Sequence, residues 1–536
     1  MRRRSSFSIM RELISHPDVP LHDHLRDVGG RAASILLDLK SHLKLQIPAE
    51  ELAKAAFVAG ICHDFGKAKK QFQDYIYNGK AKAKNKEHAA ISSVFTFVVA
   101  SKVFDRKRQP TRLLPFVCAY AVNRHHGLLC NLEKAFEEAV IEHQIAVSKG
   151  KIDDRLWGFQ FHYGEPLNLT IKFSEYRDSF EKVKADQIVK QFQCFRYSLG
   201  KKAEAQDASE NWPLDLYLAL LLIISTLTEA DVACVISAPE PGPAKVLDPE
   251  IIYRYACNQP SVKGKLQELR QDAWKELVEE KLEFAEDSAC RLTLPTGLGK
   301  TLMGLYLAGK LQKPDHTNPV IYALPYLSII EQATDVARSV FSKSSVSVIQ
   351  HHSLSFPASG QEEAPNFEQA RFILEDWQAD LVITTFDQLL YSFLTRDRGF
   401  IRRFFRLPGA VLLLDEVQTI PYRLIPAIET FLNKLNEKLG TRIIYMTATH
   451  PPFLKTSHPM IQNESEYFSS LNRTRLRLQL TPISFSKYLS ELGQWLLDRK
   501  GKKILLVANT IRSARDLFQH LKKLKENRYE TVPFIG

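Results

Sequence analysis

The feature that most constrains the fold is a change in hydrophobic pattern near residue 240. Before it, apolar residues recur at intervals of three and four, as in Ala53-Ala56-Phe57-Gly60 and Ile91-Val94-Phe95-Val98, which predicts buried helix faces. After it, short apolar runs alternate with helical patterns. The segment Ser237–Pro243 between them holds three prolines in seven residues, which is typical of a linker. The sequence therefore predicts an all-helical domain joined to a domain of alternating strands and helices.

Short apolar runs in the second part predict strands, and strands that alternate with helices predict a parallel, doubly wound sheet. The runs are Pro319–Leu324, Ser345–Ile349, Leu381–Thr385, Val411–Leu414 and Arg442–Met446. A further strand at Lys503–Val507 and a helix at Ile511–Leu524 begin another unit that the chain does not complete. We predict a helical domain over residues 13–240, a linker over 241–275, an α/β lobe over 276–470 and the start of a second lobe over 471–536.

Composition limits the class of protein. The 536 residues include 72 basic and 61 acidic side chains, a net charge of +11, which favours a polyanionic partner such as nucleic acid. Seven cysteines without a Cys-x-x-Cys pair argue against disulfides or a cysteine zinc site, and favour a reducing cytoplasm. The most apolar stretch, Leu216–Leu227, is shorter than the ~20 residues that span a bilayer. We therefore expect a buried helix and no membrane association.

A phosphate-binding loop is predicted at Leu294–Thr301, after a possible strand and before a helical run. Glycines at 297 and 299 allow backbone N–H groups to approach phosphates closely. Lys300 would reach the β and γ phosphates of ATP, and Thr301 would ligate magnesium. About 115 residues later an apolar strand ends in Asp415-Glu416. Asp415 would hold the magnesium, and Glu416 would orient or deprotonate the attacking water.

These motifs resemble those of superfamily-2 helicases. The resemblance rests on Asp415-Glu416-Val417-Gln418 and Met446-Thr447-Ala448-Thr449, and that family also tolerates a residue other than glycine at the first loop position. The segments Ala323–Gln332 and Gln350–Ser353 are more specifically similar to the type I CRISPR-associated nuclease-helicase, which joins an N-terminal HD nuclease to a superfamily-2 helicase. The resemblance covers roughly residues 20–530. It implies an ATP site that includes Thr296, Gly297, Gly299, Lys300, Thr301 and Asp415.

The resemblance also implies roles for residues along the first motor lobe. Tyr326 and Gln332 would line its DNA-facing side, while Thr384-Thr385 and Thr447–Thr449 would couple the nucleotide state to the grip on the strand. The alternatives are a loop cap around Pro325 and threonines that only favour strand ends.

A metal centre is predicted around His63-Asp64, since an adjacent imidazole and carboxylate can reach one ion. HD-superfamily phosphohydrolases combine such a pair with histidines on other helices and a distant aspartate. By this resemblance His24, His63, Asp64 and Asp231 would hold one ion, and Asp64, His88, His125 and His126 a second. His22 is an alternative to His24. Lys67 would stabilise phosphate charge or lie on a solvated face. The mixed ligands suit manganese, cobalt, nickel or iron.

Asp231 supports the ligand set independently, because it lies on an otherwise apolar helix. A carboxylate is costly to bury without a partner, and a metal ion would offset that cost. The alternative is that the end of this helix is exposed beside Glu229.

We expect a cytoplasmic, monomeric enzyme of CRISPR interference that cleaves single-stranded DNA with Asp64 and Lys67 at its centre. In the full-length family, cleavage accompanies ATP-driven 3′–5′ unwinding with Glu416, after recruitment by an RNA-guided surveillance complex. Lys69, Lys70 and the lysines of residues 80–86 either hold the DNA backbone or form a solvated surface. Arg402–Arg406 offers charge with aromatics for DNA, and the alternative is that Phe404 and Phe405 belong to the core. Because the arginines of a second lobe are not in the sequence, we expect weak ATPase activity. Two alternatives remain: a hydrolase of small nucleotides, and a motor-inactive DNA-binding remnant.

Overall fold

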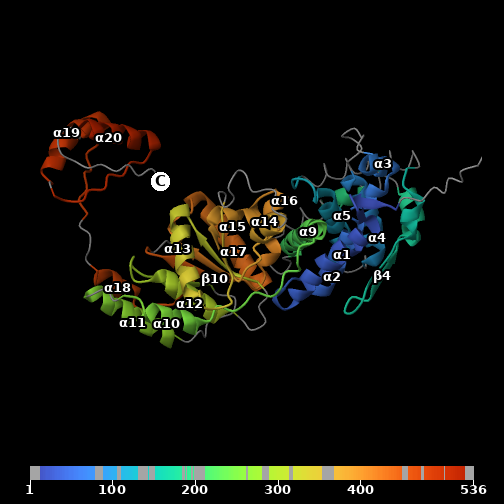
Figure 1. The fold of residues 1–536 in the computed structure, drawn as a ribbon, viewed down its shortest axis with the longest axis horizontal. Coiled ribbons are helices and arrows are strands. Elements are labelled where there is room, and N and C mark those ends of the chain that lie inside the picture. Colours follow the sequence, from blue (N-terminus) through green and yellow to red (C-terminus); the bar gives the residue numbers. More distant parts are fainter. Residues whose placement is uncertain are drawn as a thin grey trace, which may run out of the picture. The chain divides into compact units, whose positions relative to one another are not determined.

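The computed structural model describes residues 12–78, 88–104, 110–130, 143, 151–183, 188, 190–194, 197, 212–260, 264–280, 289–312, 318–352, 367–449, 457–471, 476–499 and 501–524 (Figure 1). The lysines predicted to form a basic loop at 80–86 lie outside these residues. The chain divides into two compact units, residues 1–471 and 472–536. The predicted domain boundaries within the first unit remain predictions.

The first part of unit 1 is a helix bundle, as the helical periodicity predicts (blue to green in Figure 1). Its main helices are α1 (Leu21–Asp38), α2 (Ala49–Cys62), α4 (Ala89–Val103), α5 (Leu114–Arg124) and α9 (Trp212–Val235). Helices α1 and α2 touch through glycines: a Cβ on Gly60 would lie 2.5 Å from the Cα of Gly29. A larger residue at either position would push the two helices apart. The close contact holds His24 of α1 near His63, which follows α2.

Two short hairpins add to the bundle, and the helical pattern did not predict them. They consist of β1 (Ile14–His16) with β2 (Val19–Pro20), and β3 (Gln160–Tyr163) with β4 (Leu169–Lys172), both antiparallel. The first hairpin precedes α1 directly. It brings the N-terminal end of the described chain to the side of the bundle where His24 lies.

Helix α9 is longer than the apolar stretch on which it was predicted. Its segment Pro213–Val235 is long and apolar enough to cross a membrane, but 78% of its most apolar window is buried inside the protein. Such burial is also found in the core helices of globular domains. Near its C-terminal end α9 carries Glu229 and Asp231, both buried, so the alternative of an exposed helix end is wrong.

A buried ion pair fastens α9 to α1. The Arg31 guanidinium donates to both carboxylate oxygens of Glu229, at 2.9 and 2.5 Å, and to the carbonyl oxygens of Ala238 and Pro239. Burial raises the pKa of Glu229 to about 7, although Arg31 opposes the shift. Arg31 therefore anchors both the helix and the start of the proline-rich segment that follows it.

Replacing Arg31 with alanine should destabilise the helix bundle by about 3–5 kcal/mol, because it leaves a buried carboxylate without its partner. Urea unfolding followed by circular dichroism in the presence of a chelator would measure the loss. Arg26→Ala is the matched control, since Arg26 lies on the same helix and forms exposed ion pairs with Asp23 and Asp27. Equal unfolding midpoints for the two variants would contradict this role of Arg31.

The second part of unit 1 is built on a seven-stranded parallel sheet, as predicted (yellow to orange in Figure 1). The strand order is β11-β5-β10-β9-β6-β8-β7. The strands are β5 (Cys290–Thr293), β6 (Val320–Leu324), β7 (Val348–His351), β8 (Leu381–Thr385), β9 (Val411–Asp415), β10 (Arg442–Thr447) and β11 (His458–Pro459). The intervening helices are α12 (Lys300–Leu311), α13 (Leu327–Val340), α14 (Phe367–Glu375), α15 (Phe386–Leu394), α16 (Arg398–Ile401) and α17 (Ile425–Leu439).

The two faces of this sheet belong to different cores. Alternate strand residues point to opposite faces: Leu412 and Leu414 join the hydrophobic core that also contains the helix bundle, whereas Val411 and Leu413 join a second core with α12. The bundle and the sheet therefore share one continuous core. Phe404 and Phe405 lie in the shared core, so the aromatics of the Arg402–Arg406 segment pack internally and are not available to DNA bases.

Other segments differ from the sequence prediction. Most of the range predicted as a linker forms α10 (Pro249–Cys257) and α11 (Lys265–Glu279), whose apolar residues pack in the second core. The segment Lys503–Val507, predicted as a strand, is not one. Leu505 and Val507 are 83% and 84% exposed, since no strand among the described residues covers them. In unit 2 the helices α19 (Phe485–Leu497) and α20 (Ile511–Leu524) pack through a small leucine core.

Candidate metal centre and nucleotide site

Asp64 lies at the turn where α2 ends. The helix stops at Cys62, and the backbone continues through His63 and Asp64 into a 3₁₀ turn at Phe65–Ala68. Glycine at 66 lets this turn pack on the start of α4, because a Cβ there would lie 2.6 Å from the carbonyl oxygen of His88. The close packing brings His88 to the carboxylate of Asp64, and both His63 and Asp64 are fully buried.

The first ligand cluster joins four side chains from helices α1 and α9 and from the turn that follows α2. The Nε2 atom of His24 lies 3.4 Å from Asp64 Oδ2 and 3.3 Å from Asp231 Oδ1. The Nε2 atom of His63 lies at 3.3 and 3.4 Å from the same two oxygens. All four ligand atoms lie within 4.8 Å of one another, a spacing that one divalent ion could bridge.

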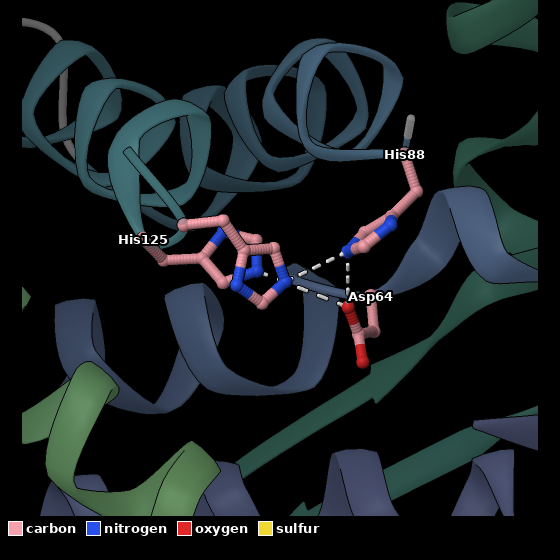
Figure 2. Close-up of side chains that lie close together, drawn as sticks. Asp64, His88 and His125 are labelled. Atoms are coloured by element: carbon pink, nitrogen blue, oxygen red, sulfur yellow. Dashed lines mark hydrogen bonds and ion pairs between the residues drawn. The ribbon is translucent and has the colours of Figure 1, made fainter. Parts of the chain in front are cut away.

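The second cluster lies on the other oxygen of Asp64. Figure 2 shows His88 and His125 directed at this carboxylate: His88 Nε2 is 2.8 Å and His125 Nε2 is 3.9 Å from Asp64 Oδ1. His126 Nε2 lies 3.1 Å from His88 Nε2, and the four residues again place ligand atoms within 4.8 Å. Asp64 is thus common to both clusters.

The chemistry of these side chains fits divalent ions. Buried ligand atoms of His24, His63, Asp64 and His125 make no hydrogen bond among the residues that the structure describes. His63 Nδ1 is 2.6 Å from the Gly60 carbonyl and His125 Nδ1 is 2.5 Å from the Val122 carbonyl. A carbonyl acceptor at Nδ1 turns Nε2 toward the cluster, as in protein metal sites. Nitrogen and oxygen donors together suit a transition-metal ion.

The protonation of the ligands differs across the centre. Burial would lower the pKa of His63, but the carboxylates of Asp64 and Asp231 raise it to about 10. Burial lowers the pKa of His126 to about 4 and that of His125 well below its usual range. His125 and His126 are therefore neutral at pH 7, whereas His63 carries a proton that an ion must displace.

Ion binding should consequently depend on pH. Below a pKa of about 10 the neutral fraction of His63 rises about tenfold per pH unit, and only neutral imidazole binds a metal. We expect the affinity for manganese to rise about tenfold per unit between about pH 7.5 and 9, where ordinary histidines are already neutral. Competition with a metal-buffering chelator would measure the slope, which His63→Gln should flatten. An affinity independent of pH in the unmodified chain would contradict this.

Lys67 faces the centre and not solvent, so the solvated-face alternative is wrong. Its Nζ lies 2.6 Å from Asp64 Oδ2 and 3.5 Å from His16 Nε2. His16 of β1, which the sequence did not mark as a site residue, packs edge-on against His24, and burial lowers its pKa to about 4. A cavity of about 490 Å³ opens here. Its lining includes His16, Lys67, Phe72, Tyr75, His88 and His126.

His22 lies outside both clusters. Its Nε2 is 3.3 Å from the Gln160 carbonyl oxygen and its ring stacks on Phe161. Of the two alternatives on α1, the geometry therefore brings His24 into the centre.

The nucleotide loop joins β5 to α12 at the carboxyl edge of the sheet, where open α/β sheets bind ligands. Gly297 and Gly299 have φ angles of 87° and 93°, which residues with a side chain rarely adopt. The Lys300 ammonium donates to the Leu294 carbonyl at 3.0 Å, across the turn of the loop. Thr296 is exposed and Thr301 is half-buried, so both lie at the accessible side of the predicted ATP site.

The acidic pair lies at the end of β9, at the same edge. Asp415 accepts a hydrogen bond from the Tyr322 hydroxyl at 2.8 Å, and burial raises the pKa of Asp415 to about 6. Tyr322 on β6 was not predicted as a site residue. Glu416 has a left-handed backbone, with φ of 53°, which is uncommon for a side chain of this size. Such strain at the end of a strand is typical of functional turns.

Hydrogen bonds link this acid to the end of β10. Gln418 Nε2 donates to Glu416, and Thr447 Oγ1 donates to Gln418 Oε1 at 2.9 Å. The Thr449 backbone N–H donates to Thr447 Oγ1 at 3.0 Å. The threonines are therefore connected to the nucleotide side of the lobe. Tyr326, predicted on the DNA-facing side, is 57% exposed.

Known proteins are similar to both parts of this chain. The Cas3 HD domain family matches residues 14–178, and the DEAD/DEAH box helicase family matches residues 269–456. A CRISPR-associated nuclease/helicase Cas3 of Haloferax volcanii is 28% identical over 552 residues, which cover 87% of this chain and 57% of the relative. The protein of the same name from Methanothermobacter thermautotrophicus is 27% identical over 249 residues, which cover 42% of this chain and 29% of the relative.

The fold is similar to the crystal structure of T. fusca Cas3, with a TM-score of 0.53 and 14% identity over 95% of this chain and 62% of that chain. The chain spans little more than half the length of the Haloferax relative. The two family matches follow one another along this chain. The HD match comes first and contains most of the metal ligands, and the helicase match comes second and contains the nucleotide loop. The chain therefore combines a match to the Cas3 HD domain family with a match to the DEAD/DEAH box helicase family, and it is similar over most of its length to CRISPR-associated nuclease/helicases named Cas3.

Proposed function

We propose that the HD domain cleaves single-stranded DNA with two divalent transition-metal ions, such as manganese, cobalt, nickel or iron. The observation that carries the proposal is the position of Asp64, whose two oxygens face two separate ligand clusters. When bound, two neighbouring ions activate water for attack on a phosphodiester and neutralise charge on the phosphate.

The residues of the chain would hold and orient the substrate. Asp64 would hold one ion together with His24, His63 and Asp231. It would hold the other ion together with His88, His125 and His126. Lys67 lies between Asp64 and the cavity, where its ammonium can contact a phosphate oxygen and stabilise the charge that develops on it. His16 is neutral at pH 7 and within reach of Lys67, so it can accept a hydrogen bond from the ammonium and direct it toward the cavity.

The shape of the approach favours a single strand over a duplex. The centre is buried in a helix bundle, and the cavity beside it, about 490 Å³, is far narrower than a double helix. Phe72 and Tyr75 contribute aromatic rings to its wall. Aromatic side chains stack on bases of any sequence, which suits a nuclease that degrades DNA without sequence preference.

The helicase domain would bind ATP and magnesium through Lys300, Thr301 and Asp415, with Glu416 directing the hydrolytic water. Together with a second motor lobe, this lobe would drive 3′–5′ movement on DNA. We further propose that the protein acts as a cytoplasmic monomer in antiviral defence, recruited to target DNA by an RNA-guided surveillance complex. The similarity to CRISPR-associated nuclease/helicases supports this assignment.

The direct test is cleavage of circular single-stranded DNA by the purified chain with manganese or nickel and without ATP. We expect degradation of the circle, complete inhibition by a chelator and no hydrolysis of cyclic nucleotides. Hydrolysis of cyclic nucleotides with intact DNA would instead identify a hydrolase of small nucleotides. Binding of DNA without any cleavage would identify a DNA-binding remnant.

A further inference from the structure

His126 of the second cluster differs from His63 and His125 in the group that its Nδ1 atom faces. His63 and His125 each direct Nδ1 at a backbone carbonyl, which can accept the proton that a metal-bound imidazole carries there. His126 directs Nδ1 at the guanidinium of Arg398, with Arg398 Nη1 at 3.3 Å. Its Nε2 faces His88 and the cluster.

Arg398 belongs to the helicase domain and is firmly placed. It is the first residue of α16, and its Nη1 also donates to the His125 carbonyl oxygen at 2.6 Å. The residues just before Arg398 also contact the HD domain. The Leu129 N–H donates to the Arg396 carbonyl at 2.8 Å, and the Tyr217 hydroxyl donates to the Phe393 carbonyl. Several contacts thus hold the guanidinium against the His125-His126 pair.

A guanidinium has five N–H donors and no acceptor. A neutral imidazole that binds a metal through Nε2 carries its proton on Nδ1 and needs an acceptor there. At His126 that proton would meet an N–H donor of Arg398. Arg398 therefore disfavours the form of His126 that binds a metal.

We propose that Arg398 is a positioning residue through which the helicase domain weakens the second metal site of the HD domain. This inference rests on the proposed two-ion nuclease. It makes His126 the weakest ligand of the centre and leaves the first cluster, which Arg398 does not touch, as the tight site. The second ion would bind fully only when Arg398 withdraws or a different group takes its place.

The test is titration of the full chain with manganese, with bound ions counted by equilibrium dialysis. Arg398→Gln offers an amide oxygen as acceptor and removes the charge, so the second ion should bind about tenfold more tightly, in the range of outer-shell effects on metal affinity. Arg398→Lys keeps the positive charge and a side chain that donates N–H groups and has no acceptor, so it should bind like the parent. Arg396→Ala, an exposed arginine of the same segment, is the control for surface charge.

A double variant separates this role from a structural one. If Arg398 acts through His126, then Arg398→Gln should not change metal affinity in a His126→Ala background. Thermal unfolding of each variant without metal checks that the docking survives. Weaker or unchanged binding of the second ion in Arg398→Gln would overturn the inference, as would a tenfold gain that persists without His126. None of these results affects cleavage by the parent, so failure of the nuclease proposal itself would be seen separately.

Discussion

Replacing Asp64 with alanine should eliminate cleavage of single-stranded DNA, with a loss of more than about 10³-fold, because both ions lose their common ligand. Each oxygen of Asp64 faces a different cluster, so no other single substitution among the described ligands affects both. The measurement is degradation of circular single-stranded DNA with manganese, together with the number of ions bound per chain. Both should fall in parallel.

Two further variants make this result interpretable. Asp64→Asn keeps the shape of the buried side chain and should fold like the parent while losing the ions. His22→Ala removes a histidine that lies on α1 near His24 but outside the clusters, and it should retain cleavage. If Asp64→Ala and Asp64→Asn cut as fast as the parent, the nuclease assignment is wrong.

Replacing Lys300 with alanine should weaken ATP binding by about a hundredfold, since a hydrogen bond from a charged donor contributes roughly 1.5–3 kcal/mol. The Lys300 side chain is buried within the nucleotide loop and now donates to the Leu294 carbonyl, from which it can turn to a phosphate. Binding of a fluorescent ATP analogue would give the affinity. Lys310→Ala, at the exposed end of the same helix, should bind nucleotide normally.

The same variant separates the two sites. Because the ligand clusters lie entirely in the helix bundle, Lys300→Ala should cut single-stranded DNA at the parental rate when ATP is absent. A large loss of cleavage in this variant without ATP would mean that the nucleotide loop supports the nuclease centre directly, which the geometry does not indicate. Normal ATP binding by the variant would refute the phosphate-loop assignment.

Much of the helicase domain could be predicted because parallel strands buried on both faces are continuous apolar runs. The prediction for Leu381–Thr385 matches β8, and that for Val411–Leu414 lies within β9. The segment Lys503–Val507, predicted as a strand, is similarly apolar but has no strand to pair with in the described part of the chain. A β-strand forms only when another strand pairs with it. The pattern of residues within a segment does not show whether such a strand is available.

The ligand clusters were predictable in part. His63-Asp64 is adjacent in sequence, and Asp231 is conspicuous on an apolar helix, whereas the choice between His22 and His24 required the orientation of α1. His16 and Tyr322 were missed, since a lone histidine before a proline and a tyrosine within a strand carry no sequence signal. Arg398 could not be found at all from sequence, because its contact depends on how two domains dock.

The central claim is that side chains from distant parts of the chain close around two ions that share Asp64. Anomalous diffraction from crystals soaked in manganese tests it most directly. We predict two peaks about 3.5–4 Å apart, one among His24, His63, Asp64 and Asp231 and the other among Asp64, His88, His125 and His126. The absence of any peak within bonding distance of Asp64 would contradict the account.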